Sequence, residues 1–221
     1  MNVLVIGASR GIGLEFVRQY RGAGAAVTAT ARDDAGLDRL RGLGAAAVLL
    51  DVADAASASS LAREIEGAGF DVAVVNAGVS AARGAGLTPP SVDDFDHVMR
   101  TNVLGPMRVI PQIVEALAPG GALAVLSSRM GSIGSRTAAG SSLYRASKAA
   151  VNSVVKDASL TWRGRAVIVS LHPGWVRTDM GGAAADIDVA SSVAGMRAVI
   201  AGLTPAANGG FFDHDGTAIP W

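Results

Sequence analysis

Tyr144 and Lys148 are the residues whose types and spacing most directly suggest chemistry. A spacing of four residues places both side chains on one face of a helix, one turn apart. A free tyrosine has a pKa near 10, which is too high for efficient proton transfer at neutral pH. A nearby ammonium group favours the phenolate and lowers that pKa. The pair therefore suits proton transfer, although two long side chains at this spacing are also common on exposed helix surfaces.

A glycine-rich turn, "GASRGIG" (Gly7–Gly13), follows the first apolar run of the chain. Glycines in such a turn let the backbone approach a diphosphate, whose charge then meets the free N–H groups and positive end of a helix. Ordinary turns between a strand and a helix also contain glycine. Here the turn follows a clear strand and opens a clear helix, which predicts a nucleotide-binding site.

Charge at the end of the second expected strand distinguishes two nicotinamide cofactors. NAD sites commonly place an acid there for the ribose 2′-hydroxyl, whereas NADP sites use arginine near the 2′-phosphate. This chain has Ala31 at the position of the acid, Arg32 next to it and Arg10 in the glycine-rich turn. Asp33 and Asp34 would partly neutralise Arg32. The two arginines favour NADP(H) over NAD(H), with solvated surface arginines as the alternative.

Seven short apolar runs predict β-strands, because their apolar residues are continuous, as in strands covered on both faces. The runs are Asn2–Gly7, Ala25–Ala31, Ala46–Asp51, Asp71–Gly78, Ala122–Ser128, Ala166–His172 and Gly209–Asp213. Segments with helical spacing lie between them, among them Leu14–Arg21, Ala55–Gly67, Val92–Val103 and Ser147–Trp162. This alternation predicts an α/β fold with a doubly wound, mostly parallel seven-stranded sheet and helices on both faces.

Irregular sequence is concentrated in segments that follow expected strands. Ligands of open α/β sheets bind outside the carboxyl ends of the strands. Residues 80–90, 131–142 and 181–188 lie just beyond such ends, and with the C-terminal tail they form the expected substrate rim. Pro119–Gly121 is expected to turn into the fifth strand. No linker, repeat or low-complexity tail divides the chain, so we expect a single domain over residues 1–221.

The composition excludes several function classes. With 19 basic and 19 acidic residues the formal net charge is zero, so nucleic acid is not an expected partner. The absence of cysteine excludes disulfides and thiol catalysis, and the three histidines lack metal-ligand spacing. No apolar stretch approaches the ~20 residues that span a bilayer, and no signal-like leader precedes the first strand. We therefore expect a cytoplasmic protein without metal or membrane, and the predominance of arginine over lysine suggests a GC-rich bacterial genome.

Several motifs occur in a diagnostic order. They are "GASRGIG", "NAG" (Asn76–Gly78), "TNVLG" around Asn102, "SS" (Ser127–Ser128), "YRASK" and "HPGWVRT". Over essentially the whole chain, this order resembles the short-chain dehydrogenase/reductase family. The stretches "SSRMGSIGS", "LYRASKAAVN", "HPGWVRTDMGG" and "FFDHDGTAIPW" are similar to its C-factor and sniffer-type carbonyl reductase group. The resemblance implies a Rossmann fold and NADPH-dependent reduction of an aldehyde or ketone to an alcohol by hydride transfer.

The resemblance also implies catalytic roles. Tyr144 would exchange the proton with the substrate oxygen, and Ser128 would hydrogen-bond and orient that oxygen. Lys148 would hold the nicotinamide ribose and depress the pKa of Tyr144, while Asn102 would keep a water molecule in the proton relay. Ser128 precedes Tyr144 by sixteen positions, about three more than in many members. Ser127 is therefore a weaker candidate for the same role.

A cofactor-binding set follows from the same resemblance. Asp51 and Val52 would flank the adenine, and Asn76–Gly78 would run beside the ribose. Pro173 and Gly174, with Val176 and Thr178, would grip the carboxamide. The full expected set is Gly7, Ser9, Arg10, Gly11, Ile12, Gly13, Arg32, Asp51, Val52, Asn76, Ala77, Gly78, Tyr144, Lys148, Pro173, Gly174, Val176 and Thr178.

Other interpretations stay open. One is a nucleotide-binding signalling or regulatory protein of the C-factor type with weak or no turnover, although retention of the Tyr, Lys, Ser and Asn favours an enzyme. Epimerase or dehydratase chemistry is less favoured, because the short chain leaves little room for a sugar-nucleotide lobe. Met180 and Trp175 would line the pocket or only its surroundings, and His172 is interpreted as structural. Trp221 would cover the site or pack at a subunit contact in a homodimer or homotetramer.

Overall fold

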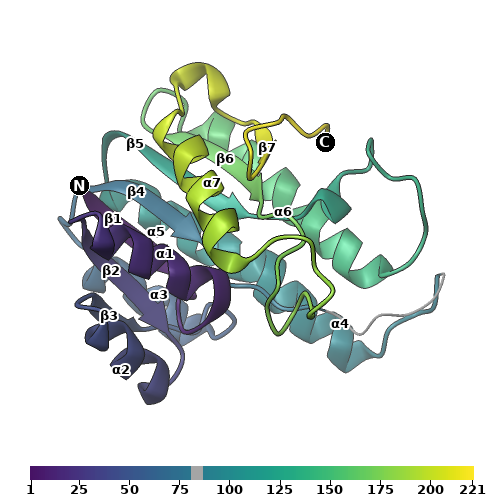
Figure 1. Ribbon diagram of the computed structural model, residues 1–221, viewed down its shortest axis with the longest axis horizontal. Coiled ribbons are helices and arrows are strands. Elements are labelled where there is room, and N and C mark those ends of the chain that lie inside the picture. Colours follow the sequence, from purple (N-terminus) through teal and green to yellow (C-terminus); the bar gives the residue numbers. More distant parts are fainter. Residues whose placement is uncertain (81–86) are drawn as a thin grey trace.

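The chain folds around one β-sheet, seen in a computed structural model that describes residues 1–80 and 87–221 (Figure 1). The strands of this described part are β1 (Asn2–Ile6), β2 (Ala26–Ala31), β3 (Ala46–Leu49), β4 (Phe70–Val75), β5 (Leu117–Leu126), β6 (Val167–His172) and β7 (Phe211–Asp213). The α-helices are α1 (Gly11–Gly22), α2 (Asp34–Gly42), α3 (Ala55–Glu64), α4 (Val92–Met99), α5 (Gly105–Ala116), α6 (Ser142–Thr161) and α7 (Val189–Ala201). Shorter elements are the π-helix η1 (Arg100–Leu104) and the 3-10 helices η2 (Arg129–Gly131) and η3 (Pro205–Ala207).

The order of the strands creates a crevice at the centre of the sheet. The order is β3-β2-β1-β4-β5-β6-β7, and each neighbouring pair in the described residues is parallel. The chain runs outwards from β1 to β3 and then returns to β4, on the other side of β1. Open α/β sheets bind ligands at the carboxyl ends of the strands where the order reverses in this way. The predicted doubly wound fold is confirmed, with a sheet that is parallel throughout.

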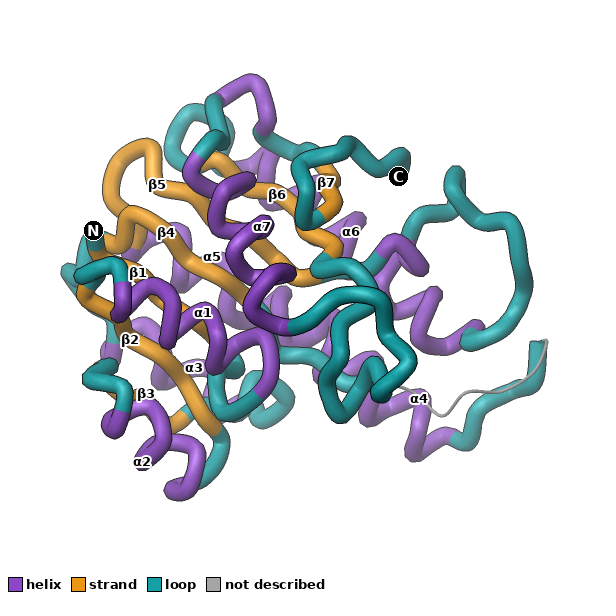
Figure 2. The backbone as a smooth tube through the Cα atoms, viewed as in Figure 1, coloured by secondary structure: helices purple, strands orange, loops and turns teal. Residues whose placement is uncertain are grey.

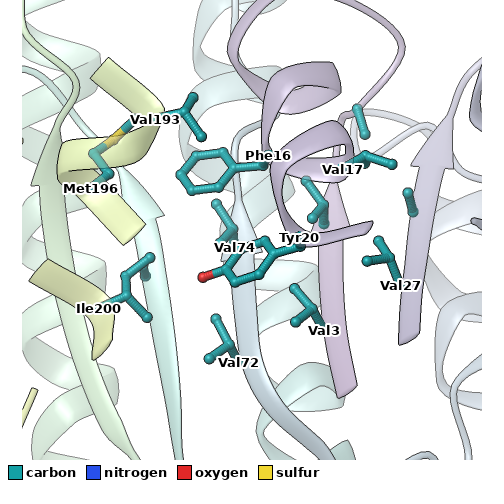
Figure 3. Close-up of a cluster of buried hydrophobic side chains, with 14 of the residues drawn as sticks. Val3, Phe16, Val17, Tyr20, Val27, Val72, Val74, Val193, Met196 and Ile200 are labelled. Atoms are coloured by element: carbon teal, nitrogen blue, oxygen red, sulfur yellow. The ribbon is translucent and has the colours of Figure 1, made fainter. Parts of the chain in front are cut away.

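The sheet buries apolar side chains on both faces, which explains the continuous apolar runs of the strands. Val3 of β1 belongs to the core under α1, α2 and α7, whereas its neighbour Leu4 belongs to the core under α3, α5 and α6. Figure 3 shows Phe16 and Tyr20 of α1 packed over the first face, close to Met196 of α7. Burying one large apolar side chain contributes about 1.5–3 kcal/mol to the free energy of folding. The two cores therefore stabilise the sheet from both faces.

Two expected helices differ from the structure in ways that matter for the site. α6 begins at Ser142, five residues before the expected start, so Tyr144 and Lys148 both lie within the helix. The segment expected as one helix, Val92–Val103, is divided into α4 and the π-helix η1. A π-turn widens the helix by one residue and redirects its side chains, and such turns are frequent at functional sites. Apolar spacing carries no signal for this change of hydrogen-bond pattern.

The predicted turn at Pro119–Gly121 is an irregularity inside β5. Phe70 of β4 pairs with Leu117, but Val72 pairs with Ala122, so the pairing register shifts across the intervening residues. Gly120 has a φ of +77°, a backbone conformation that glycine adopts without the strain of a side chain. The three residues therefore interrupt the pairing within β5, where a turn before the strand was expected.

The long loops gather at one edge of the sheet. Figure 2 shows the loops after β5 and β6 on the same side of the molecule, opposite the N-terminus. This is the edge at which the crevice between β1 and β4 opens. In the described part of the chain, no helix is long and apolar enough to cross a membrane.

Candidate active site

A cavity of about 320 Å³ lies at this edge of the sheet. Its volume falls within the range of small-molecule sites. Most of the expected cofactor-binding residues line it: Gly7, Ser9, Arg10, Gly11, Ile12, Arg32, Asp51, Val52, Asn76, Ala77, Gly78, Tyr144, Lys148, Pro173 and Thr178. The expected residues that do not line it are Gly13, Gly174 and Val176 in the cofactor set, and Asn102 and Ser128 in the catalytic set. Of the expected rim, residues 81–86 lie outside the described residues.

The glycine-rich turn is shaped by close backbone contacts. Gly7 has a φ of +80°, and a Cβ there would lie 2.7 Å from the Cα of Ala77. A Cβ on Gly13 would overlap the carbonyl oxygen of Gly7, so this glycine lets α1 pack tightly without lining the cavity. The turn is held by Thr30, whose Oγ1 accepts the Gly7 N–H at 2.9 Å, and by Asn76, whose Nδ2 donates to the Gly7 carbonyl at 2.6 Å. Motif reasoning missed Thr30, since it reads as an ordinary strand residue.

The N-terminus of α1 carries no side-chain cap. Arg10 occupies the capping position without a capping hydrogen bond. In contrast, aspartate or serine side chains cap α2, α3, α4 and α7. The free N–H groups and the positive end of the α1 dipole are the usual receptor for a phosphate group. The turn and the uncapped helix therefore fit the diphosphate of a dinucleotide.

Two arginines line the end of the cavity near β2, and a third lies next to it. Arg32 lines the cavity directly. Arg10 also lines it, but its Nη1 lies 2.5 Å from Oδ2 of Asp179 in the loop after β6. Arg39 of α2 donates from Nε to the carbonyl oxygen of Ser9 at 3.0 Å. Arg39 was not predicted, because a single arginine on a helix gives no local signal. These three positive charges suit a phosphate better than a neutral hydroxyl.

Tyr144 and Lys148 lie at the cavity wall with Ser128 beside them. The Nζ of Lys148 lies 5.8 Å from the centroid of the Tyr144 ring and donates to the carbonyl oxygen of Leu126 at 2.9 Å. A side-chain hydrogen bond joins Tyr144 to Ser128. The Ser127 hydroxyl instead donates to the Lys148 carbonyl at 3.4 Å, although Ser127 also lines the cavity. Of the two candidate serines, Ser128 is the one that influences the ionisation of Tyr144.

Burial dominates the ionisation of this pair. It raises the pKa of the Tyr144 phenol, and the hydrogen bond from Ser128 opposes that rise only partly. Burial also lowers the pKa of Lys148 to about 8. Lys148 does not contribute to the shift of the Tyr144 pKa in this structure, because its ammonium group is directed to the Leu126 carbonyl. A neutral phenol at physiological pH is the form that can donate a proton.

Asn102 lies behind the cavity, in the π-helix η1. Its Oδ1 accepts the Val79 N–H at 2.8 Å, and its Nδ2 donates to the Val79 carbonyl at 2.9 Å and to Ser147 Oγ at 3.1 Å. The side chain thus joins the segment after β4 to α6. A Cβ on Gly78 would lie 3.3 Å from Oδ1 of Asn102 and 3.5 Å from Nζ of Lys148. The absence of a side chain at Gly78 keeps the space between these two polar groups open.

The loop after β6 forms the opposite wall. Val176 is buried and pairs with Ile187, so it supports the loop from behind. Thr178 accepts the Gly181 N–H at 3.1 Å and lines the cavity. Met180 also lines it, whereas Trp175 does not and donates from Nε1 to the Gly181 carbonyl. Of the two residues proposed for the pocket, the structure therefore places only Met180 at its wall.

Comparisons with known proteins agree with this arrangement. The family model described as short chain dehydrogenase matches residues 1–188. The C-signal protein of Myxococcus xanthus is 44% identical over 154 residues, which cover 68% of this chain and 92% of that protein. The structure of the carbonyl reductase Sniffer of D. melanogaster has a TM-score of 0.91 and 29% identity, covering 100% of this chain and 99% of that one. The NADPH-bound carbonyl reductase from chicken fatty liver has a TM-score of 0.85 and 31% identity, covering 100% and 98%.

Proposed function

Because the chain belongs to the short-chain dehydrogenase family, we propose that it is an NADP(H)-dependent oxidoreductase that reduces an aldehyde or ketone to an alcohol. The single observation that carries the proposal is the meeting of Ser128, Tyr144 and Lys148 beside a cavity with an uncapped, glycine-lined helix end. The likeness to carbonyl reductases supports the same reaction class.

The residues around the cavity suit the parts of NADPH. The glycine-rich turn and the N-terminus of α1 would hold the diphosphate, and Arg32 and Arg39 would meet the 2′-phosphate. Arg10 would contribute once it exchanges its Asp179 partner for that phosphate. Asp51 and Val52 would flank the adenine, and Pro173 and Thr178 would contact the carboxamide. When bound, NADPH supplies the hydride, and the protein supplies binding and orientation.

Side chains of the protein would supply the proton that the carbonyl oxygen gains and would then replace it. Tyr144, kept neutral by burial, donates its proton to the carbonyl oxygen as negative charge develops there. Ser128 donates a hydrogen bond to the same oxygen and fixes its position. Lys148 holds the ribose, and Asn102 keeps a water molecule near Gly78 through which the proton on Tyr144 is replaced. The alcohol product gains one hydride and one proton, so the reaction balances.

The substrate rim belongs to the same proposal. It comprises the described residues of 80–90, together with 131–142, 181–188 and the C-terminal tail. Met180 adds an apolar contact at the cavity wall, and Ile133 is an exposed apolar residue of the rim, 70% accessible. An apolar aldehyde, ketone or quinone fits this setting better than a phosphorylated sugar.

Similarity to the C-signal protein favours a second candidate, a nucleotide-binding signalling protein with little turnover. Measuring NADPH and NADH oxidation across a panel of aldehydes, ketones and quinones separates the two. The reductase predicts steady turnover of at least one carbonyl class with a marked preference for NADPH. NADPH binding without turnover of any member of the panel would favour the signalling role. Equal rates with NADH and NADPH would contradict the predicted preference for NADPH.

A further inference from the structure

Four residues from three sequence motifs meet close to Ser128, and these four have no role in the proposed chemistry. Arg129 comes from "SSRMGSIGS", His172 from "HPGWVRT", and Asp213 with His214 from "FFDHDGTAIPW". We call these four residues the Asp213 cluster. The ends of β6 and β7 bring two of them together, because His172 and Asp213 are direct partners in the parallel ladder. None of the four residues lines the cavity.

Asp213 is the centre of this cluster. Its Oδ2 lies 2.5 Å from Nη2 of Arg129. Its Oδ1 lies 2.6 Å from the ring Nδ1 of His214 and also accepts the backbone N–H of His214 at 2.7 Å. The carboxylate side chain is 9% exposed, whereas that of Arg129 is 54% exposed. Hydrogen bonds from His214 and Arg129 hold the pKa of Asp213 below its usual value despite burial. A buried, ionised carboxylate holds its hydrogen-bond partners in fixed positions, because losing one partner would leave a buried charge unpaired and destabilise the fold.

Arg129 directly follows Ser128, so the Asp213 cluster acts on the turn that carries the serine. On one side of Ser128, the Ser127 N–H donates to the Leu171 carbonyl of β6 at 2.8 Å. On the other side, the guanidinium group of Arg129 is tied to β7. The turn itself is closed by the Gly131 N–H, which donates to the Ser128 carbonyl at 2.7 Å. The residues on both sides of Ser128 are thus fixed in position, Ser127 by a hydrogen bond to β6 and Arg129 by an ion pair with β7.

The segment after Arg129 is anchored to the same part of the chain. Ser132 Oγ donates to the carbonyl oxygen of Pro220 at 2.5 Å, and the Ile133 N–H donates to the carbonyl oxygen of Trp221 at 2.7 Å. The Trp221 ring stacks on Phe211, the first residue of β7, with centroids 5.4 Å apart. The segment from β7 to Trp221 therefore braces the turn at two separate points.

We propose that Asp213 is a positioning residue for catalysis, which holds the Ser128 hydroxyl against Tyr144 and the substrate oxygen through its ion pair with Arg129. The inference rests on the proposed function, in which Ser128 orients the reacting carbonyl. Asp213 does not line the cavity and has no contact with Tyr144, so its effect on the reaction is indirect.

A double-mutant cycle between Asp213 and Ser128 tests this inference. We expect Asp213→Asn to lower kcat/KM for a carbonyl substrate by about 10- to 100-fold, the cost of a small misplacement of a positioned group. In the Ser128→Ala background, the same substitution should change kcat/KM by less than about twofold, because the two sites act as one unit. The Kd for NADPH should be unchanged. Arg129→Gln tests the ion pair from its more exposed partner, should Asp213→Asn impair folding.

A second readout does not depend on turnover. The chain has two tyrosines, so Tyr20→Phe protein labelled with fluorotyrosine reports residue 144 alone by fluorine NMR. Asp213→Asn and Ser128→Ala should each raise the apparent pKa of this phenol, since the hydrogen bond from Ser128 lowers it. The double variant should match the single variants. Asp38→Asn, which removes the exposed ion pair with Arg41, is the matched control and should leave the titration unchanged.

The outcomes separate the two proposals. Unchanged titration and kcat/KM in Asp213→Asn would overturn the positioning role, as would an equal loss in both Ser128 backgrounds. If the native protein reduces no carbonyl compound, the proposed function fails, while the titration of residue 144 still decides the role of Asp213.

Discussion

His172 shows how a single residue with a buried ring nitrogen can control the response of the protein to pH. Its Nδ1 has no hydrogen-bond partner among the described residues, and burial lowers its pKa to about 4. The neighbouring Asp213 raises this pKa, but the effect is too small to compensate for the loss of hydration. The histidine is therefore neutral in the folded protein at physiological pH, as the structural interpretation of the sequence requires.

The His172 environment predicts a loss of stability in mild acid. The folded-state pKa of about 4 lies below the unfolded value of 6.5, so between these pH values the unfolded chain binds more protons. Stability is complete above pH 6.5 and falls as the pH drops to 4, by up to about 3 kcal/mol from this residue. Urea unfolding across this range should show a smaller fall for His172→Asn. The exposed His97→Asn control should keep the full fall, and identical curves for native protein and His172→Asn would contradict the assignment.

At the scale of elements, the site depends on close approach between α1, β4 and the glycine-rich turn. Gly13 lies within α1, where a Cβ would overlap the carbonyl oxygen of Gly7 and lie 2.6 Å from Nδ2 of Asn76. Gly22, at the end of the same helix, has no atom within 4 Å of its Cβ position. The two glycines therefore have different functions in one element.

This difference predicts opposite results for two similar substitutions. Gly13→Ala should push the glycine-rich turn away from Asn76 and weaken NADPH binding by about tenfold or more, with a lower melting temperature. Gly22→Ala should leave NADPH binding unchanged and preserve or slightly raise the melting temperature, since alanine favours helix. Calorimetric titration and thermal unfolding measure both effects. Equal NADPH affinity in the two variants would show that the packing of α1 does not shape the site.

Most of the elements could be predicted because their physical signals are local. Continuous apolar runs predicted the strands, and the spacing of Tyr144 and Lys148 placed both correctly on one helix face. The π-helix that holds Asn102 was missed, since its altered hydrogen bonding has no compositional signature. Likewise, the bulge at Pro119–Gly121 could not be distinguished from a turn, because both require the same residue types.

At the scale of the whole molecule, the candidate site is assembled from segments far apart in the chain. The glycine-rich turn, the Ser128 turn and α6 meet only because β1, β4 and β5 are neighbours in the sheet. Family resemblance predicted this assembly, and the short-chain dehydrogenase match confirms the family. Long-range partners such as Arg39, Asp179 and the Asp213 cluster could not be predicted, since they depend on side-chain contacts between distant elements.

In the proposed reaction, Tyr144 transfers the proton while the rest of the molecule binds the cofactor. Tyr144→Phe removes only the hydroxyl group, so its NADPH affinity in a fluorescence titration should stay within about twofold of the native value. The matched control, Tyr20→Phe, alters the other tyrosine, which is buried under α1 in the core away from the cavity. This control should retain normal turnover.

The decisive measurement is the steady-state rate of NADPH oxidation by Tyr144→Phe with a carbonyl substrate that the native protein reduces. We expect kcat to fall by at least about 100-fold with NADPH still bound. A kcat within about tenfold of the native value would contradict the proposed role of Tyr144.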